Sequence, residues 1–506
     1  MDASAPLDTT LGRIGLVVAA LLAAAAVLSD RPRLRAGATA SALVLTPILL
    51  IAEIWDTDQF ETFRDRPAFS ALAAVAALAA LAALAAFIAR RPLALPLLAV
   101  AALPFRIPIE TGGQTANLLV PLYGVIAAGC LAQMPALLSG RLPAGTRERP
   151  KGLLSAVLVG FVALYALQGA YADDVSVAGQ QVVFFYVPFA LLFGLMVRLE
   201  WTTRLLMWCL AIVVGLALVF ALIGFVEYGT RTLLFNPKVI ASNAFGSYFR
   251  VNSLFFDPNI YGRFLAEVMI GVAAVLAWTT RRRDIGLLAI ALAVMWGALV
   301  LTFSQSSFAA LLAGLAVLAA LRWSLKPVAI ILAVILGLGL VGGAAALAVR
   351  GDFPSAKRVN KATVGRSKLV KGGLDLWTDR PLQGFGSGSF QPEYKRKRHL
   401  TRPNAVIASH TTPVTVLAEQ GLIGLALYVV LIVVALRTLL TGAYGRLARA
   451  AIGAAFVALV VHTMVYAAFL EDPMTWVLLA AGAALAAAQR PSSPSSSSSA
   501  SLKNLV

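Results

Sequence analysis

The sequence predicts an all-α, polytopic membrane protein: a transmembrane helical bundle of about 12–15 spans, with a long extracytoplasmic loop that carries short helices. The chain is 59% hydrophobic and only 13% charged, whereas soluble proteins are about a quarter charged. Apolar runs recur from Leu11 to Ala488, and about 20 apolar residues cross a bilayer as a helix. Short polar loops separate these runs, as expected for helices, which satisfy their own backbone hydrogen bonds in lipid.

About fifteen apolar runs are candidate spans. They cover residues 11–29, 36–55, 69–89, 92–105, 117–139, 151–170, 181–197, 205–226, 258–279, 285–302, 306–321, 327–349, 413–436, 450–470 and 473–489. The fourth run is short and bounded by prolines. If it does not cross, the alternation of loops between the two faces breaks.

Basic residues concentrate in every second loop. These loops contain Arg31, Arg33 and Arg35; Arg90 and Arg91; Arg141 to Lys151; Arg198 and Arg204; Arg281 to Arg283; Arg322 and Lys326; and Arg437 to Arg449. Short cytoplasmic loops are enriched in Lys and Arg, so we expect this set inside the cell and the protein in the cytoplasmic (inner) membrane. The same enrichment explains the net charge of +18 without a nucleic-acid partner.

This topology divides the chain into five parts. We expect N-terminal spans in residues 1–105, a core bundle with an outer loop 227–257 in residues 106–349, an extracytoplasmic catalytic loop in residues 350–412, C-terminal spans in residues 413–489, and a disordered Ser-rich cytoplasmic tail in residues 490–506.

The outer loop 350–412 is unusually basic. It carries thirteen of the 42 Lys and Arg residues, and long loops can escape the positive-inside trend. A basic outer loop favours an anionic partner such as a diphosphate, although attraction to lipid headgroups is the alternative explanation.

Several motifs in one order resemble the O-antigen ligase and O-antigen polymerase family. Gly365 and Arg366 are followed by Gly373–Trp377, the glycine-rich turn Arg380–Phe390, and His410, which lies nine residues before Glu419 of the Glu-x-Gly-x-x-Gly helix Val416–Gly424. Upstream matches are Arg250–Ser253 with Asp257–Asn259, Pro104–Pro108 and Asn117–Tyr123. One departure is Gln305, where members often carry Arg.

The resemblance implies a metal-independent glycosyltransferase without a cofactor. It would move a glycan from undecaprenyl diphosphate to an acceptor hydroxyl, on a lipid-linked or other envelope glycan, at the outer face of the bilayer. Arg250 and Arg366 match family arginines, and arginine can hold phosphate oxygens bidentately. His410 matches the family histidine, and a neutral imidazole near neutral pH can act as a general base.

Four further residues are secondary substrate-binding candidates. Arg263, one turn inside its helix, would face the lipid diphosphate or snorkel outward. Gly386 and Gly388 would offer backbone N–H groups to a phosphate. Glu419 would lie about 13 Å below His410 on a continuous helix, too deep to orient it, and would pair with an arginine or a backbone group. Gly421 and Gly424 are expected to allow close helix packing.

Other assignments remain open. The shared domain also fits a repeat-unit polymerase, and a non-enzymatic lipid-linked glycan transporter or an assembly protein is a further alternative. A basic run from Lys395 to Arg402 would mark an anionic acceptor. We expect His399 on a solvated face and His462 packed inside a span. The three histidines are far apart in sequence and indicate no metal site.

Overall fold

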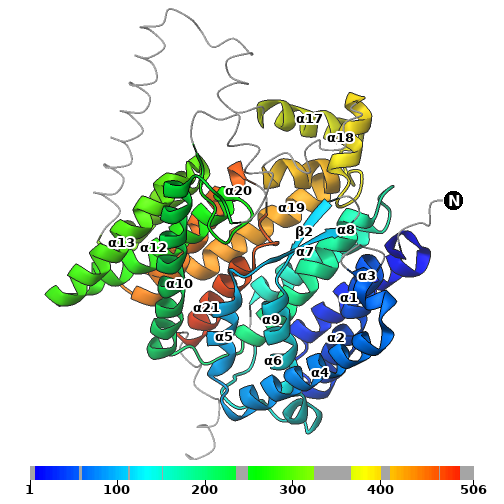
Figure 1. Ribbon diagram of the computed structural model, residues 1–506, viewed down its shortest axis with the longest axis horizontal. Coiled ribbons are helices and arrows are strands. Elements are labelled where there is room, and N and C mark those ends of the chain that lie inside the picture. Colours follow the sequence, from blue (N-terminus) through cyan, green and yellow to red (C-terminus); the bar gives the residue numbers. More distant parts are fainter. Residues whose placement is uncertain are drawn as a thin grey trace, which may run out of the picture.

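The computed structural model describes residues 6–55, 60–111, 114–150, 152–234, 249–323, 366–399, 411–466 and 468–489. Its helices form one bundle (Figure 1). The N-terminal half contains α1 (Thr10–Leu28), α2 (Pro32–Ile54), α3 (Glu61–Asp65), α4 (Pro67–Arg90), α5 (Ala94–Ala102), α6 (Val120–Leu138), α7 (Leu153–Gly169), α8 (Ser176–Gln180), the π-helical η3 (Gln181–Tyr186), α9 (Val187–Met196) and α10 (Thr203–Thr230). The C-terminal half contains α12 (Pro258–Trp278), α13 (Arg282–Thr302), α14 (Gln305–Arg322), α17 (Arg366–Asp379), α18 (Phe390–Arg398), α19 (Thr412–Leu440), α20 (Leu447–Val465) and α21 (Pro473–Ala488).

The predicted fold class, a polytopic helical membrane protein, is confirmed. Within the described residues, eleven helices are long and apolar enough to cross a membrane, and α7 and α21 are shorter apolar helices. The expected span 327–349 and the tail 490–506 lie outside the described residues. The helical region of the outer loop includes the two short helices α17 and α18, as expected.

The fourth expected span, residues 92–105, differs from a continuous helix. Its helix α5 has nine residues and is therefore only about 13 Å long, less than half of the roughly 30 Å hydrocarbon core. The segment still bridges much of the bundle, since Pro92 lies next to Gly145 while Phe105 packs edge-on against Phe220 far along α10. Non-helical backbone at such depth is tolerated where protein surrounds it.

A small hairpin follows α5 and is the exception to the all-helical architecture among the described residues. Strands β1 (Ile107–Thr111) and β2 (Gln114–Leu118) pair antiparallel, with Ile107 opposite Leu118. Because α5 ends at Ala102, the backbone groups of these two strands have no helix to pair them. They pair across the hairpin instead.

The basic loops meet at one end of the bundle. Arg198 donates to the carbonyl of Val27, and Arg322 donates to that of Ala277, so loops distant in sequence lie together there. At the opposite end, Tyr171 donates to the carbonyl of Gln383. The predicted alternation thus agrees with the geometry, and the cytoplasmic location of the basic end stays a prediction.

Small residues allow the C-terminal helices to pack closely. A side chain at Gly314 of α14 would meet Ile270 of α12 and Ala458 of α20, and these three helices contact one another. Close approach over Gly and Ala is the usual way helices associate in lipid. Figure 1 shows α17 and α18 at one end of the bundle, beyond α19, where they rest outside the apolar core.

Candidate active site

The start of α12 positions Arg250. Asp257 caps this helix by accepting from the backbone of Asn259 and Ile260, with Pro258 at the first helical position, an arrangement that satisfies free N–H groups and fixes the helix start. The Arg250 guanidinium donates to the carbonyl of Thr302 at 2.8 Å and to the side-chain oxygen of Asn259 at 3.1 Å. Arg250 is therefore held between the ends of α12 and α13, half-buried.

A buried carboxylate fixes the backbone beside Arg250. Glu227, near the end of α10, is 1% exposed and accepts from the N–H groups of Asn252 and Ser253 at 3.2 and 2.8 Å. Ser253 has a left-handed backbone, with φ of 51°, which is costly for a residue with a side chain. The two bonds to Glu227 hold this conformation in place.

Arg263 is buried inside the protein, only 1% exposed. It forms an ion pair with Asp472 and donates to the carbonyl of Ala468 at 2.8 Å. Both partners belong to the turn between α20 and α21. Arg263 thus ties α12 to this turn, and it does not snorkel toward the surface.

A third arginine completes the group. Arg106, at the end of the α5 segment, lies close enough to Asp472 and Arg263 for their charges to interact. Tyr466 hydrogen-bonds Asp257 and interacts with the charges of both Arg250 and Arg263. We call Arg106, Arg250 and Arg263 the arginine cluster. The sequence offered one hint of Arg106, its place in the resembling stretch Pro104–Pro108, but no helical periodicity extends to it.

A hydroxyl network lies under the cluster where α14 begins. Ser304 caps α14, its hydroxyl bonds that of Ser307 at 2.8 Å, and Ser306 bonds His462 at 3.1 Å. His462 is fully buried and hydrogen-bonded, as predicted. His399 is exposed at the end of α18, also as predicted.

The glycine-rich turn before α18 is bound to α19. Gly386 donates its N–H to the carbonyl of Glu419 at 2.8 Å, and the Glu419 carboxylate accepts from the N–H groups of Gly388 and Phe390 at 2.9 and 3.1 Å. Gly384, Gly386 and Gly388 all have positive φ, and a side chain at Gly384 would meet the Glu419 backbone. These N–H groups are occupied by Glu419, so the turn does not present them to a phosphate.

Gly421 breaks α19 instead of packing against another helix. Its φ of 63° and ψ of −161° are non-helical, and a side chain there would meet the carbonyl of Leu382. The following N–H groups, of Leu422 and Ile423, donate to Pro381 and Leu382. The expectation of a helix–helix contact at Gly421 is wrong because the glycine turn fills this kink.

The basic run in α18 is neutralised within the protein. Arg396 pairs with Asp173 and Glu393, Lys397 pairs with Asp379, and Arg398 pairs with Asp375. These exposed pairs bind α18 to α17 and to the loop after α7. Within the described part of the predicted run Lys395–Arg402, these pairs reduce the positive charge that Arg396, Lys397 and Arg398 could offer to an anionic acceptor.

The side chains of two predicted site residues, Arg366 and His410, lie outside the described residues, so the structure does not place them relative to the arginine cluster. Arg366 is the first residue of α17. His410 is two residues before α19 in the sequence. Among the described residues, no three His, Cys, Asp or Glu side chains gather in a way that could hold a metal ion.

A cavity of about 90 Å³ lies beside the arginine cluster, between α7, η3, the first turns of α19 and the turn before α21. We call it the polar cavity because several polar side chains interrupt its largely apolar wall. Its wall includes Tyr165, Gln181, Thr412, Glu419 and Glu471. Burial raises the pKa of the Glu471 carboxyl above its ordinary value, and a hydrogen bond from Tyr186 and the charge of Arg263 oppose that rise.

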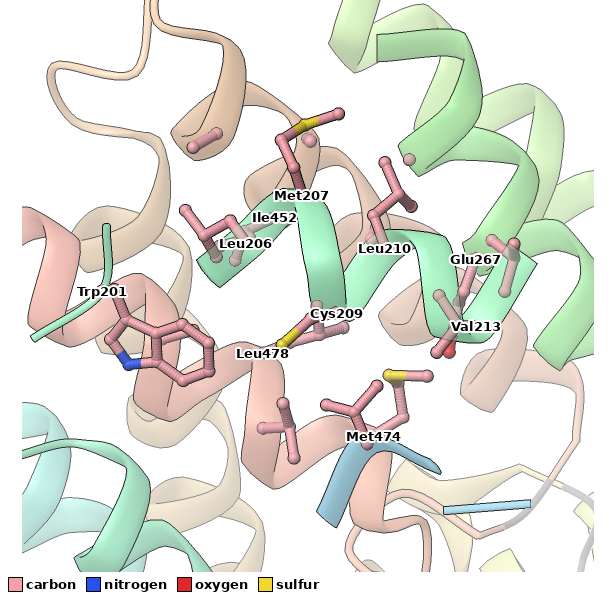
Figure 2. Close-up of a pocket in the computed structure, with 18 of the residues that line it drawn as sticks. Trp201, Leu206, Met207, Cys209, Leu210, Val213, Glu267, Ile452, Met474 and Leu478 are labelled. Carbon is pink, nitrogen blue, oxygen red and sulfur yellow. The ribbon is translucent and has the colours of Figure 1, made fainter. Parts of the chain in front are cut away.

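An apolar pocket of about 170 Å³ lies between α5, α10, α12, α20 and α21. Figure 2 shows Trp201 and Glu267 on opposite sides of it, with Leu206, Cys209 and Met474 along the wall. Glu267 is 6% exposed, and one of its carboxylate oxygens has no hydrogen-bond partner in the described part of the chain. Glu267 is one helical turn from Arg263, so the apolar pocket leads toward the arginine cluster.

One family model matches part of the chain. Residues 290–429 match the model described as O-antigen ligase. The chain carries an O-antigen ligase domain. The resemblance predicted from the sequence is thereby confirmed for this segment, which contains α14, the glycine turn and the first half of α19. No curated protein matches the chain.

The arginine cluster lies outside the matched segment but against it. Arg250 donates to Thr302 of the O-antigen ligase domain, and Tyr466 and Asp472 come from the chain that follows. The matched segment is thus one part of a larger bundle, and the protein is a multi-pass membrane protein that carries a segment similar to O-antigen ligases.

Proposed function

We propose that the protein is a glycosyltransferase that moves a glycan from undecaprenyl diphosphate to an acceptor hydroxyl on the extracytoplasmic side of the cytoplasmic membrane. The observation that carries the proposal is that Arg106 lies near Arg263, and Arg250 and Arg263 both lie near Tyr466, at the end of the bundle opposite the basic loops and next to the O-antigen ligase domain. Because basic loops favour the cytoplasmic face, the cluster would face outward.

In the proposed reaction, the acceptor oxygen attacks the anomeric carbon of the donor sugar. The new glycosidic bond forms with inversion, the bond from that carbon to the diphosphate oxygen breaks, and undecaprenyl diphosphate leaves with the bonding electrons. The acceptor proton passes to His410 as general base. Arg250 and Arg366 would bind the diphosphate and offset its developing charge, since each preorganised donor of this kind contributes about 3–4 kcal/mol to transition-state stabilisation.

The apolar pocket supports a lipid-linked donor. It is lined almost wholly by hydrocarbon and sulfur side chains and lies between helices, as a pocket for a prenyl chain must. Its proximity to the arginine cluster suits a ligand with an apolar tail and an anionic head.

A reconstituted transfer assay tests the proposal. The purified protein in lipid vesicles receives undecaprenyl-diphosphate-linked glycan with a radiolabel, together with a lipid extract of the host envelope as the source of acceptor. We expect the label to pass to the acceptor in one step and to leave undecaprenyl diphosphate behind. A ladder of lipid-linked products would identify a polymerase instead, and retention of all label on undecaprenyl diphosphate would refute the transferase assignment.

A further inference from the structure

The ionisable side chains of the polar cavity include two acids, whereas the arginine cluster is basic. Two carboxylates line the cavity, those of Glu419 and Glu471, and none of the described residues in its wall is Lys, Arg or His. A phosphate placed there would have two acidic side chains and no basic one as direct neighbours in the described wall, which is unfavourable at short range. The diphosphate of a lipid-linked donor therefore does not suit the cavity.

A hydrocarbon chain in the cavity would leave polar groups of its wall unpaired. The side-chain oxygens of Gln181 and Thr412 are buried and have no hydrogen-bond partner among the residues that the structure describes. Gln420, 1% exposed, also lines the cavity and has a side-chain oxygen in the same condition. Apolar contact would leave such groups unsatisfied at a cost of about 1–3 kcal/mol each.

Aromatic rings form a further part of the wall, beside aliphatic side chains such as Val177 and Leu470. Tyr165 and Tyr186 pack edge to face, with ring centroids 4.8 Å apart, and Phe161 and Phe469 also contribute. A cavity of about 90 Å³ has room for several water-sized groups, since one water needs roughly 10–15 Å³ by this measure. Aromatic walls with a few hydrogen-bonding groups are typical of small-ligand sites.

One turn separates the cavity from the arginine cluster. Ala468 lines the cavity while its carbonyl accepts from Arg263. Glu471 lines the cavity, whereas the next residue, Asp472, forms the ion pair with Arg263. A ligand in the cavity would thus lie beside a ligand held by the arginines.

We infer that the polar cavity binds an uncharged, hydroxyl-bearing sugar of the acceptor, with Gln181 and Glu471 receiving its hydroxyl groups. Hydroxyls both donate and accept, which matches the carboxylate, amide and hydroxyl groups of the wall. This inference rests on the proposed transferase function and adds an acceptor subsite separate from the donor's diphosphate site.

A protection experiment tests sugar binding without transfer. Gln181→Cys introduces a thiol into the cavity of the full-length protein, and the native Cys130 and Cys209 are buried. Neutral methyl hexopyranosides, at tens of millimolar, are expected to slow modification of this thiol by a methanethiosulfonate reagent, whereas hexose 6-phosphates are not. Equal protection by both, or by neither, would overturn the inference even if the protein transfers glycan.

A kinetic experiment tests the role in the reaction. In the reconstituted assay, Gln181→Ala and Glu471→Gln are each expected to raise the acceptor KM about 10-fold, equivalent to roughly 1.4 kcal/mol, without changing the donor KM. The matched controls are Gln180→Ala, whose side chain faces Glu53, and Glu200→Gln, which pairs with Arg147 at the basic end. An unchanged acceptor KM in an active protein, or a raised donor KM, would refute the acceptor subsite. A wild type that transfers nothing refutes the proposed function alone, because the protection experiment still decides whether the cavity binds sugar.

Discussion

The arginine cluster and the glycine turn lie at the same end of the bundle, but they hold their charges differently. The Glu419 carboxylate is fully engaged by N–H groups of one short loop, at Gly388 and Phe390. Arg250 and Arg263 each bind two groups, which come from separate elements: α12, α13 and the turn before α21. The buried Glu419 therefore has a structural role. Arg250 is half-buried, so it is the arginine that can exchange its protein partners for a ligand.

Breaking the buried ion pair should have the largest effect. Arg263→Ala leaves Asp472 buried without its cation, and removing one partner of such a pair costs roughly 3–5 kcal/mol. We expect a clear fall in the thermal unfolding temperature of the detergent-solubilised protein. Arg263→Lys, which keeps the charge, should lose less, and an unfolding temperature unchanged in Arg263→Ala would contradict a stabilising pair.

Arg250 is expected to matter for transfer and little for stability. It is half-buried, and Arg250→Ala should lower the transfer rate by about 10²–10³-fold, as for loss of one preorganised donor. The unfolding temperature should stay near that of the wild type. If Arg250→Ala loses stability but keeps full transfer activity, Arg250 has a structural role and does not bind the donor.

Glu419→Gln tests the glycine turn. Glutamine has a single side-chain acceptor oxygen, so one of the N–H groups of Gly388 and Phe390 loses its partner at a cost of about 1–3 kcal/mol. Hydrogen exchange should rise across residues 385–393 and stay unchanged in α12. Glu393→Gln, a buried carboxylate of α18 that pairs with the exposed Arg396, is the control, and equal exchange in both variants would argue against the Glu419 contact.

The smallest effect is expected in the basic run of α18. Lys397 pairs with Asp379 at the surface, with side chains 37% and 48% exposed, and such pairs contribute at most about 1 kcal/mol. Lys397→Ala should therefore leave both stability and transfer nearly unchanged. A large loss of transfer with normal folding would restore the hypothesis that this run binds an anionic acceptor.

Hydropathy predicted most helices because it is a local property. Leu153–Gly169 of α7 and Pro258–Trp278 of α12 fall where apolar runs lie in the sequence. The segment 92–105 was the harder case, because its apolar composition is the same whether it forms a full helix or a nine-residue helix followed by a strand. The short helix followed by a strand is possible because other helices surround it. A hydropathy profile contains no information about those neighbours.

The candidate site was predictable only in part. Arg250 belongs to a motif that can be recognised in the sequence, and Asp257 and Pro258 mark the start of α12 there. Arg106 carries no comparable signal, and Glu471 is a single acidic residue in a short turn. Their importance comes from neighbours that are hundreds of residues away in the chain, such as Arg263 and Gln181.

By itself, the sequence determined the membrane-spanning class, the grouping of basic loops and the resemblance to the O-antigen ligase family, because composition, charge and local motifs are written along the chain. Only the tertiary structure decided that Arg263 pairs with Asp472, that Glu419 secures the glycine turn, and that a polar cavity lies beside the arginines. The physical reason is that the partner of a buried polar group is set by how distant helices pack, and packing depends on the whole bundle.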